Sequence, residues 1–152
     1  MNKDNDGFTL VELLIVAGIM SVVLTGMIKL FIYTNIQAEL AGNKTMAVNE
    51  AQMKLEEIRN HTYAQIVADY GSGGTPGNTF NLNQLNGMGV IYVDSTNTEL
   101  LEVDIKVCWQ DKYNRIIGED LDLDGVLDVG EDNNSNGQID SIVSLSSMIT
   151  RR

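Results

Sequence analysis

The chain begins with a nearly unbroken apolar run from Phe8 to Ile28, which reads FTLVELLIVAGIMSVVLTGMI. Glu12 is the only charged residue in this run. A helix of this length reaches about 32 Å, at ~1.5 Å per residue, which matches the hydrocarbon thickness of a bilayer. The run is longer than the apolar core of a secretory signal, and no small-residue cleavage site follows it. The pattern therefore predicts a membrane-spanning helix.

After Tyr33 the pattern becomes amphipathic and contains no proline as far as Ile66. Glu50 and Lys54 lie one helical turn apart, and we expect them to pair on one face. Another face carries apolar residues at spacings of 7, 3, 4 and 3, namely Ala41, Val48, Ala51, Leu55 and Ile58. This periodicity predicts a helix that needs a cover on its apolar side. We expect one helix from about Phe8 to about Ala64, with a membrane segment at residues 8–33 and an amphipathic stalk at residues 34–66.

The remaining residues, 67–152, show the pattern of a small antiparallel sheet. Residues 69–79 hold four glycines and the only proline, which mark the turn out of the helix. Alternating apolar positions then occur at Val90–Val93, at Leu101, Val103, Ile105 and Val107, and at Ile142–Ile149. A period of two is typical of half-buried strands. The prediction is an α+β fold, in which the stalk packs on a β-rich head.

Charge and cysteine content narrow the classes of partner. The formal net charge is −11, and Arg151 and Arg152 are the only adjacent basic residues. Nucleic-acid backbones need clustered Lys and Arg, so we expect no direct nucleic-acid binding and favour cations as partners. Cys108 is the only cysteine, so no disulfide within the chain can brace the fold. Cys108 is predicted to be a small buried apolar residue, and the lone His61 a solvated one.

The stretch from Asp120 to Glu131 follows the twelve-residue pattern of an EF-hand calcium loop, with Gly125 at the sixth position. The predicted ligands are the carboxylates of Asp120, Asp122, Asp124, Asp128 and Glu131 and the carbonyl of Val126. Calcium prefers six to eight oxygen ligands, and alternate residues of a tight loop can direct that many inward. Six carboxylates within thirteen residues would repel one another unless a cation lay among them. The sequence therefore predicts bound Ca²⁺, acting as a cross-link in place of a disulfide.

The pattern repeats twelve residues later with weaker ligands around Gly137, and Val143 replaces the final acid. The residues of this second, weaker candidate metal site are Asp132, Asn134, Asn136, Gln138 and Asp140. Three alternatives stay open: this half shares the first ion, binds another loosely, or only extends the turn. No helical pattern flanks residues 120–140, so we expect a calcium loop inserted between strands, not a sensor that opens a groove.

The residues Gly7-Phe8-Thr9-Leu10-Val11-Glu12-Leu13, placed at the start of the apolar run, resemble the processing motif of type IV prepilins and type II secretion pseudopilins. The resemblance implies that residues 1–7 are a leader. A prepilin peptidase would cut after Gly7 and N-methylate Phe8. The resemblance also implies a pilin fold and other pilin or pseudopilin subunits as partners. The later segment MKLEEIRN resembles V-type minor pilins and I-type pseudopilins.

Glu12 allows two interpretations. A charged residue within a spanning helix is disfavoured by roughly 2.5 to 3.5 kcal/mol, so the carboxylate either snorkels to the headgroups or meets a charged partner. Cleavage after Gly7 would create an ammonium group on Phe8. In the family that the motif resembles, the matching glutamate neutralises this group on a neighbouring subunit. The resemblance therefore implies that Glu12 guides assembly.

These observations predict a non-enzymatic structural subunit, a minor pilin or pseudopilin, of a type IV pilus or a type II secretion pseudopilus. The subunit would cross the inner membrane once, with its N-terminus in the cytoplasm and its head outside, before it joins a periplasmic or cell-surface filament. The alternative is a single-pass membrane-anchored calcium-binding protein that does not polymerise. A hydrolytic enzyme is disfavoured because no Ser-His-Asp, Cys-His or zinc-type spacing is present.

Overall fold

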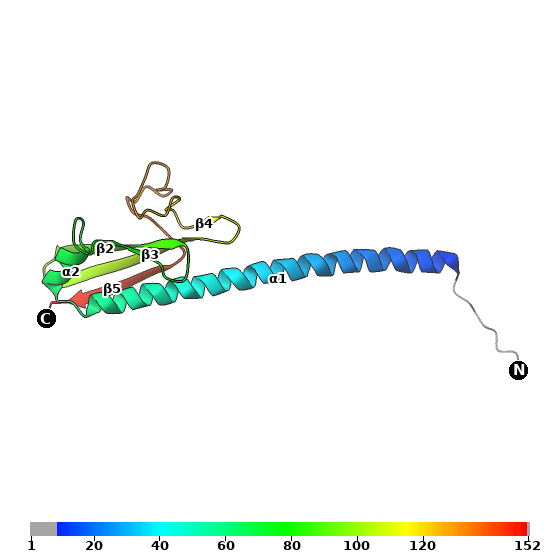
Figure 1. Cartoon of the computed structure of the whole chain (residues 1–152), viewed down its shortest axis with the longest axis horizontal. Coiled ribbons are helices and arrows are strands. Elements are labelled where there is room, and N and C mark those ends of the chain that lie inside the picture. Colours follow the sequence, from blue (N-terminus) through cyan, green and yellow to red (C-terminus); the bar gives the residue numbers. More distant parts are fainter. Residues whose placement is uncertain (1–8, 152) are drawn as a thin grey trace, which may run out of the picture. The chain divides into compact units, whose positions relative to one another are not determined.

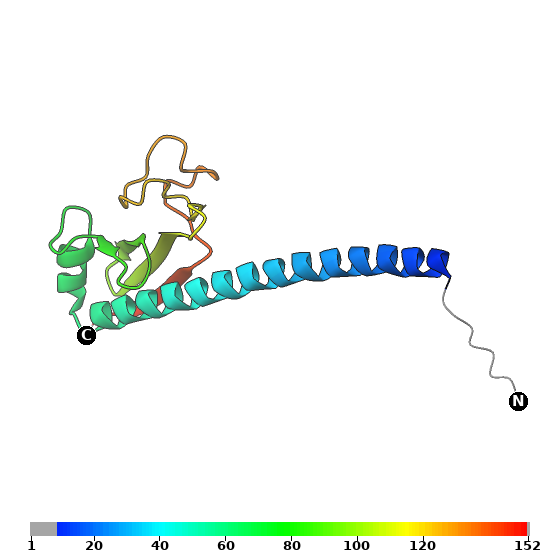
Figure 2. The same ribbon diagram turned by 45° about the vertical axis from the view of Figure 1, so that its right-hand side comes forward.

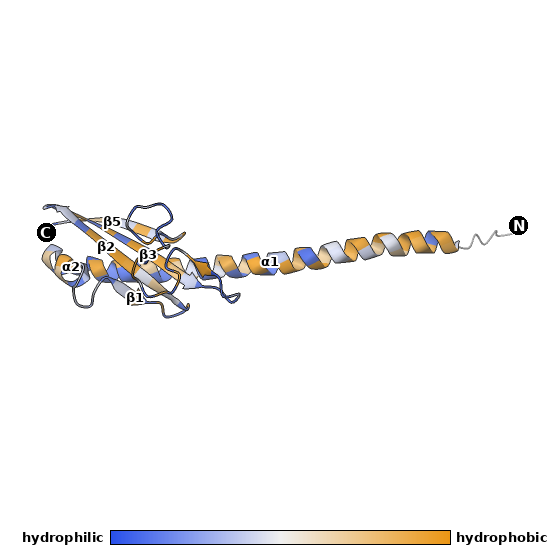
Figure 3. Ribbon diagram, turned by 90° about the horizontal axis from the view of Figure 1, so that it is seen from above, coloured by the Kyte–Doolittle hydropathy of each residue, from blue (hydrophilic) through white to orange (hydrophobic). Residues whose placement is uncertain are grey.

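The computed structural model describes residues 9–151, which form an α+β chain with two compact units, Met1–Glu39 and Leu40–Arg152. Helix α1 (Leu10–Arg59) contributes to both units (Figure 1). In the first unit every side chain from Thr9 to Asn35 is exposed. Figure 3 shows that apolar residues dominate this part of α1. By length and composition, α1 is the one helix among the described residues that can cross a membrane.

The C-terminal end of α1 differs from the prediction. The helix ends at Arg59, and a separate helix α2 (Tyr63–Tyr70) follows after a short turn. Thr62 starts α2 as a capping box, in which its backbone N–H donates to Gln65 Oε1 at 2.9 Å and its Oγ1 accepts from Gln65 N at 3.4 Å. The expected continuation of one helix to about Ala64 is therefore wrong. Residues 34–66 contain the C-terminal part of α1 and the start of α2.

The second unit contains a five-stranded antiparallel sheet built around β3 (Leu100–Gln110). One edge of β3 pairs with β2 (Gly87–Asn97), which in turn pairs with β1 (Thr79–Asn81). The same β3 pairs with β4 (Ile116–Ile117) and with β5 (Ser144–Thr150). The three predicted strands correspond to β2, β3 and β5 and are confirmed. The two short strands, β1 and β4, were not predicted.

The main core lies between one face of the sheet and the part of α1 that belongs to the second unit. Leu101, Val103, Ile105 and Val107 are all fully buried there, as their alternation predicts. On α1 the predicted residues Ala51, Leu55 and Ile58 are buried, and Val48 packs against them. Ala41 is exposed, however, and Ala47 and Glu50 are buried instead. The apolar stripe of α1 was therefore predicted correctly except at its N-terminal end.

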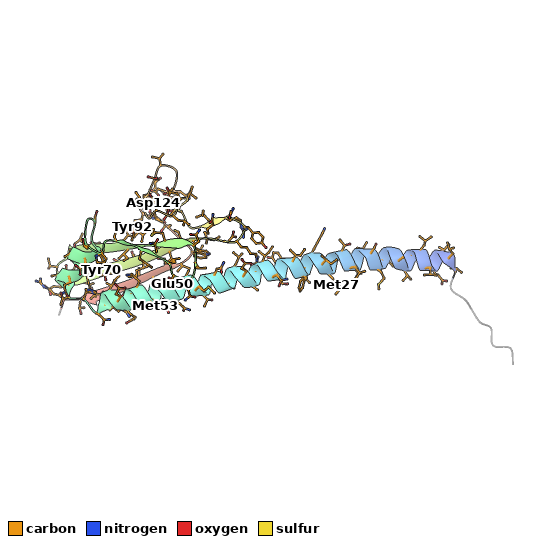
Figure 4. The ribbon with its side chains drawn as sticks, viewed as in Figure 1. Met27, Glu50, Met53, Tyr70, Tyr92 and Asp124 are labelled. Carbon is orange, nitrogen blue, oxygen red and sulfur yellow. The ribbon has the colours of Figure 1, made fainter. Side chains whose placement is uncertain are left out.

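Glu50 does not form the predicted pair with Lys54. Its carboxylate is 3% exposed and accepts the backbone N–H groups of Asn83 and Gln84 at 2.6 and 2.8 Å. Lys54 pairs instead with Glu57, with 2.8 Å between Nζ and Oε2. Figure 4 shows Glu50 on the sheet side of α1 and Met53 on the outer side. The prediction failed because Glu50 lies against the turn before β2, where its carboxylate satisfies two backbone N–H groups.

The opposite face of the sheet is covered by the segment between β4 and β5, which includes residues 120–140. Figures 1 and 2 show this segment, in yellow and orange, on the side of the sheet away from α1. Val90, Cys108 and Ile139 form a small buried cluster beneath it, joined by Tyr92, Leu123 and Leu127. Cys108 is 1% exposed, as predicted, because this segment covers it. The apolar residues of the acidic segment therefore pack it against the sheet.

Candidate functional site

The first acidic loop is organised by carboxylates that accept backbone N–H groups of the same loop. Asp120 Oδ1 accepts from Asp124 N at 3.2 Å, and Asp120 Oδ2 accepts from Gly125 N at 2.9 Å. Asp124 Oδ1 accepts from Val126 N at 2.7 Å. Glu131 closes the loop, because its two oxygens accept from Leu121 N at 2.7 Å and from Asp128 N at 2.9 Å. These bonds turn the acidic side chains toward the inside of the loop.

The second loop repeats this geometry twelve residues further on. Asp132 accepts from Asn136 N at 3.0 Å and from Gly137 N at 2.9 Å, and Asn136 Oδ1 accepts from Gln138 N at 2.8 Å. The backbone repeats as well: φ is +61° at Leu123 and +59° at Ser135, and +78° at Gly125 and +75° at Gly137. The sequence repeat is therefore also a structural repeat.

The predicted ligands of the first loop fit a divalent cation in part. One carboxylate oxygen from each of Asp120, Asp122 and Asp124 lies within 4.8 Å of the others. Two oxygens on opposite sides of a calcium ion are separated by roughly 4.6 to 5.2 Å, so these three can share one ion. Glu131 lies in the same loop, but its oxygens hold backbone N–H groups in this conformation. Within residues 9–151, the Asp128 carboxylate does not belong to this group.

The burial of Asp120 affects the ionisation of the first loop. Asp120 is fully buried, and this burial, with the nearby Glu131 carboxylate adding to it, raises the pKa of Asp120 above its usual value. Hydrogen bonds from Gly125, Leu123 and Asp124 oppose the rise. A cation among the carboxylates would favour the ionised form of Asp120. A cation bound in the first loop would therefore relieve an unfavourable charge arrangement.

The second loop is held differently, by residues outside it. The Lys106 ammonium on β3 lies 2.9 Å from Asp140 Oδ1 and lowers the pKa of Asp140 through this hydrogen bond. Glu119 accepts from Asp140 N at 3.0 Å and from Asn133 N at 3.3 Å. Tyr92, which lies under the loops in Figure 4, accepts from Ile139 N at 2.8 Å. These contacts anchor the second loop to the sheet.

The start of α1 places Glu12 in the first helical turn. Its Oε2 accepts from both the backbone N–H and the hydroxyl of Thr9, each at 2.9 Å, and Thr9 Oγ1 accepts from Glu12 N at 3.3 Å. This reciprocal arrangement is a capping box, and it positions an acidic group where the helix dipole is positive. Gly7 and Phe8 lie outside the described residues.

The N-terminal segment that contains Glu12 resembles a segment of known proteins. The family model described as the prokaryotic N-terminal methylation motif matches residues 2–28. The searches of curated proteins and of solved structures gave no match. The match includes the first part of α1, and the C-terminal part of the same helix packs on a small antiparallel sheet. The chain is type IV pilin-like.

The pilin-like assignment accounts for the exposed apolar helix of the first unit. Proteins with this motif are structural rather than enzymatic, and the motif indicates assembly with other pilin subunits. A membrane-anchored pilin also needs one apolar segment that can span a bilayer, which α1 provides.

Sequence reasoning did not find three residues of the pilin-like head that support the loops: Lys106, Glu119 and Tyr92. Lys106 could have been noticed in the sequence, because it is the only basic residue within the alternating run of β3. It lies on the face opposite the main core. Glu119 and Tyr92 carried no comparable signal, since an acidic residue before a loop and an aromatic residue in a strand are both common.

Proposed function

We propose that this pilin-like chain is a minor pilin or pseudopilin, a structural subunit of a type IV pilus or a type II secretion pseudopilus. The proposal is carried by the methylation motif at residues 2–28 together with the exposure of every side chain from Thr9 to Asn35. An exposed apolar helix needs lipid or other helices as its surroundings. The same helix then serves first as the anchor in the inner membrane and later as the assembly surface in the filament.

Processing is the first step of the proposed function. A prepilin peptidase cuts between Gly7 and Phe8 and methylates the new amino terminus, with the N-terminus in the cytoplasm and the head outside. Co-expression of the full chain with a prepilin peptidase is expected to remove seven residues and to add one methyl group, as measured by intact-protein mass spectrometry. Replacement of Gly7 by a bulky residue should prevent cleavage, while Gly18→Ala, within the helix, should not. A chain that keeps its first seven residues would support a permanent anchor instead.

Assembly is the second step, and it depends on Glu12. The Glu12 carboxylate neutralises the Phe8 ammonium group of a neighbouring subunit, since two opposite charges in an apolar environment stabilise each other strongly. Glu12→Gln is expected to reduce incorporation into filaments at least tenfold, as measured by immunoblotting of sheared fibres. Glu56→Gln, on the exposed surface of α1, is the control and should assemble normally. Normal incorporation of Glu12→Gln would contradict this role.

Calcium is the proposed stabiliser of the head. The three carboxylates of Asp120, Asp122 and Asp124 supply the core of the site, and Val126, Asp128 and Glu131 complete it when the ion binds. Outside the cytoplasm, a site with the roughly 0.1 to 1 mM affinity of extracellular modules would be loaded, and binding would stabilise the fold. The ion would join the two ends of a loop that no disulfide can hold.

Chelation of the full chain in detergent micelles is expected to lower the melting temperature by several degrees relative to millimolar Ca²⁺. Asp124→Ala should remove this difference. Asn136→Ala changes the equivalent position of the second loop and loses the equivalent hydrogen bond to a backbone N–H. This control should therefore keep the calcium dependence. Equal melting temperatures of the wild type in chelator and in calcium would contradict the proposal that calcium stabilises the head.

A further inference from the structure

The side chain of Lys106 reaches the second loop from the sheet below it. Lys106 pairs with Val90 in the β2–β3 register and lies on the sheet face that the loops cover. Its side chain is 15% exposed, and Nζ lies 2.9 Å from Asp140 Oδ1. Asp140 occupies the ninth position of the second repeat, which corresponds to Asp128 in the first. A positive charge is therefore held at a ligand position of the second loop.

The other oxygen of Asp140 is also occupied. Asp140 Oδ2 accepts from the side-chain amides of Asn134 and Asn136, at 2.7 and 2.9 Å. These residues hold the third and fifth positions of the repeat, where the first loop has Asp122 and Asp124. In the second loop the amide groups thus turn their N–H donors toward the shared acid. A metal ion would need their oxygens there instead.

The last position of the second loop cannot supply a ligand. Glu131 ends the first repeat, whereas Val143 ends the second and is 2% exposed, within the core that packs on α1. The first loop carries five carboxylates at its ligand positions and the second carries two. The carboxylates of the first loop accept backbone N–H groups, which leave their negative charge uncompensated. In the second loop Asp132 also accepts backbone N–H groups, but Asp140 pairs with the Lys106 ammonium.

We propose that the Lys106 ammonium is the cation of the second loop, so that the two loops together take one divalent ion, in the first loop, rather than two. The inference rests on the proposed calcium site of the first loop. It explains how a repeat with the same backbone geometry closes without the acids of the first: an ammonium tethered to β3 replaces a diffusible ion. Lys106 thereby determines the number of ions that the head binds.

The test counts bound Ca²⁺ by isothermal titration and equilibrium dialysis on the full chain in detergent micelles, with Ca²⁺ as the only ligand. The wild type is expected to bind one ion. Lys106→Met removes the ammonium and keeps an unbranched side chain of nearly the same length. This variant is expected to bind a second ion at least tenfold more weakly than the first. Lys106→Arg keeps the charge and should bind one ion. Lys44→Met, an exposed lysine on α1, is the control for loss of charge and should also bind one.

Two ions in the wild type, or one ion in folded Lys106→Met, would overturn the inference. No ion in the wild type would overturn the calcium proposal itself, and with it the count of one. A melt in chelator tests the role of Lys106 apart from calcium. There Lys106→Met should lower the melting temperature more than Lys44→Met does, and Lys106→Arg should recover most of the loss. A Lys106→Met melting temperature equal to that of Lys44→Met would show that Lys106 does not close the loop.

Discussion

At the scale of single residues, the two central glycines of the acidic repeat have the same backbone but different surroundings. Gly125 and Gly137 have φ of +78° and +75°, where an L-residue with a Cβ is disfavoured by about 1–2 kcal/mol. A Cβ at Gly125 would lie 2.6 Å from Thr79 Cγ2 and 3.2 Å from Met88 Cγ, whereas a Cβ at Gly137 would meet open space. The first loop thus sits tightly on β1 and β2, and the second does not at this point.

This difference predicts that Gly125→Ala destabilises the head more than Gly137→Ala does. Both variants share the cost of a positive φ, and only Gly125→Ala adds steric overlap, which in packed sites costs about 1–3 kcal/mol. Urea unfolding in chelator measures the difference without a contribution from calcium. Equal losses in the two variants would contradict the close packing of the first loop on the sheet.

The polar contacts of two residues, Glu50 and Lys106, could not be predicted from the sequence. The pairing of Glu50 with Lys54 was expected from spacing alone, which is correct only for an exposed helix face. The partners of Glu50 are two backbone N–H groups more than thirty residues away, and nothing local to α1 indicates them. The Lys106–Asp140 pair is of the same kind, since it joins a strand to a loop. Long-range polar contacts of this type depend on the tertiary fold.

At the scale of elements, the junction between α1 and α2 depends on one capping box. Thr62→Ala removes the oxygen that accepts from Gln65 N, and it should lower the free energy of unfolding by about 0.5–2 kcal/mol. Thr45→Ala is the matched control, because the Thr45 hydroxyl only donates to the Ala41 carbonyl on an exposed part of α1. Denaturant unfolding, followed by the fluorescence of the buried Trp109, measures both. A larger loss in Thr45→Ala would contradict the importance of this cap.

Elements with a clear period were predicted, and those without one were not. β2, β3 and β5 are long enough for a period of two to appear in the sequence. In β3 the buried residues alternate from Leu101 to Val107, whereas Val90 and Ile91 of β2 are both buried because each packs in a different cluster. β1 and β4 have three and two residues, which is too short for any period to appear. The spacing of Thr62 and Gln65 is that of a capping box and indicated the start of α2. The absence of a proline or a glycine-rich break nevertheless favoured one continuous helix. The acidic repeat lies between β4 and β5 and repeats its backbone geometry, a pattern that is local in sequence, while its metal binding stays a prediction.

At the scale of the whole molecule, the two units differ in what stabilises them. The buried hydrophobic residues of the described chain lie between Ala47 and Val143, all within the unit Leu40–Arg152. The described part of the first unit is one helix, exposed from Thr9 to Asn35, so its environment must come from lipid or from other subunits. The chain therefore divides into a part that folds through its own core and a part that is completed by its surroundings.

This division predicts that a fragment starting at Leu40 folds without the rest of the chain and stays soluble. It keeps Ala47, Ala51, Leu55 and Ile58, so its core is complete, and it loses only exposed apolar surface. Its urea midpoint should agree with that of the full chain in detergent, and sedimentation should show a monomer. A fragment starting at Lys54 is the control: it lacks Ala47, Glu50 and Ala51, which cover the sheet and hold the turn before β2. The control should be unfolded, because removing these residues exposes one face of the sheet to water. An unfolded Leu40 fragment would mean instead that the membrane segment contributes to the stability of the head.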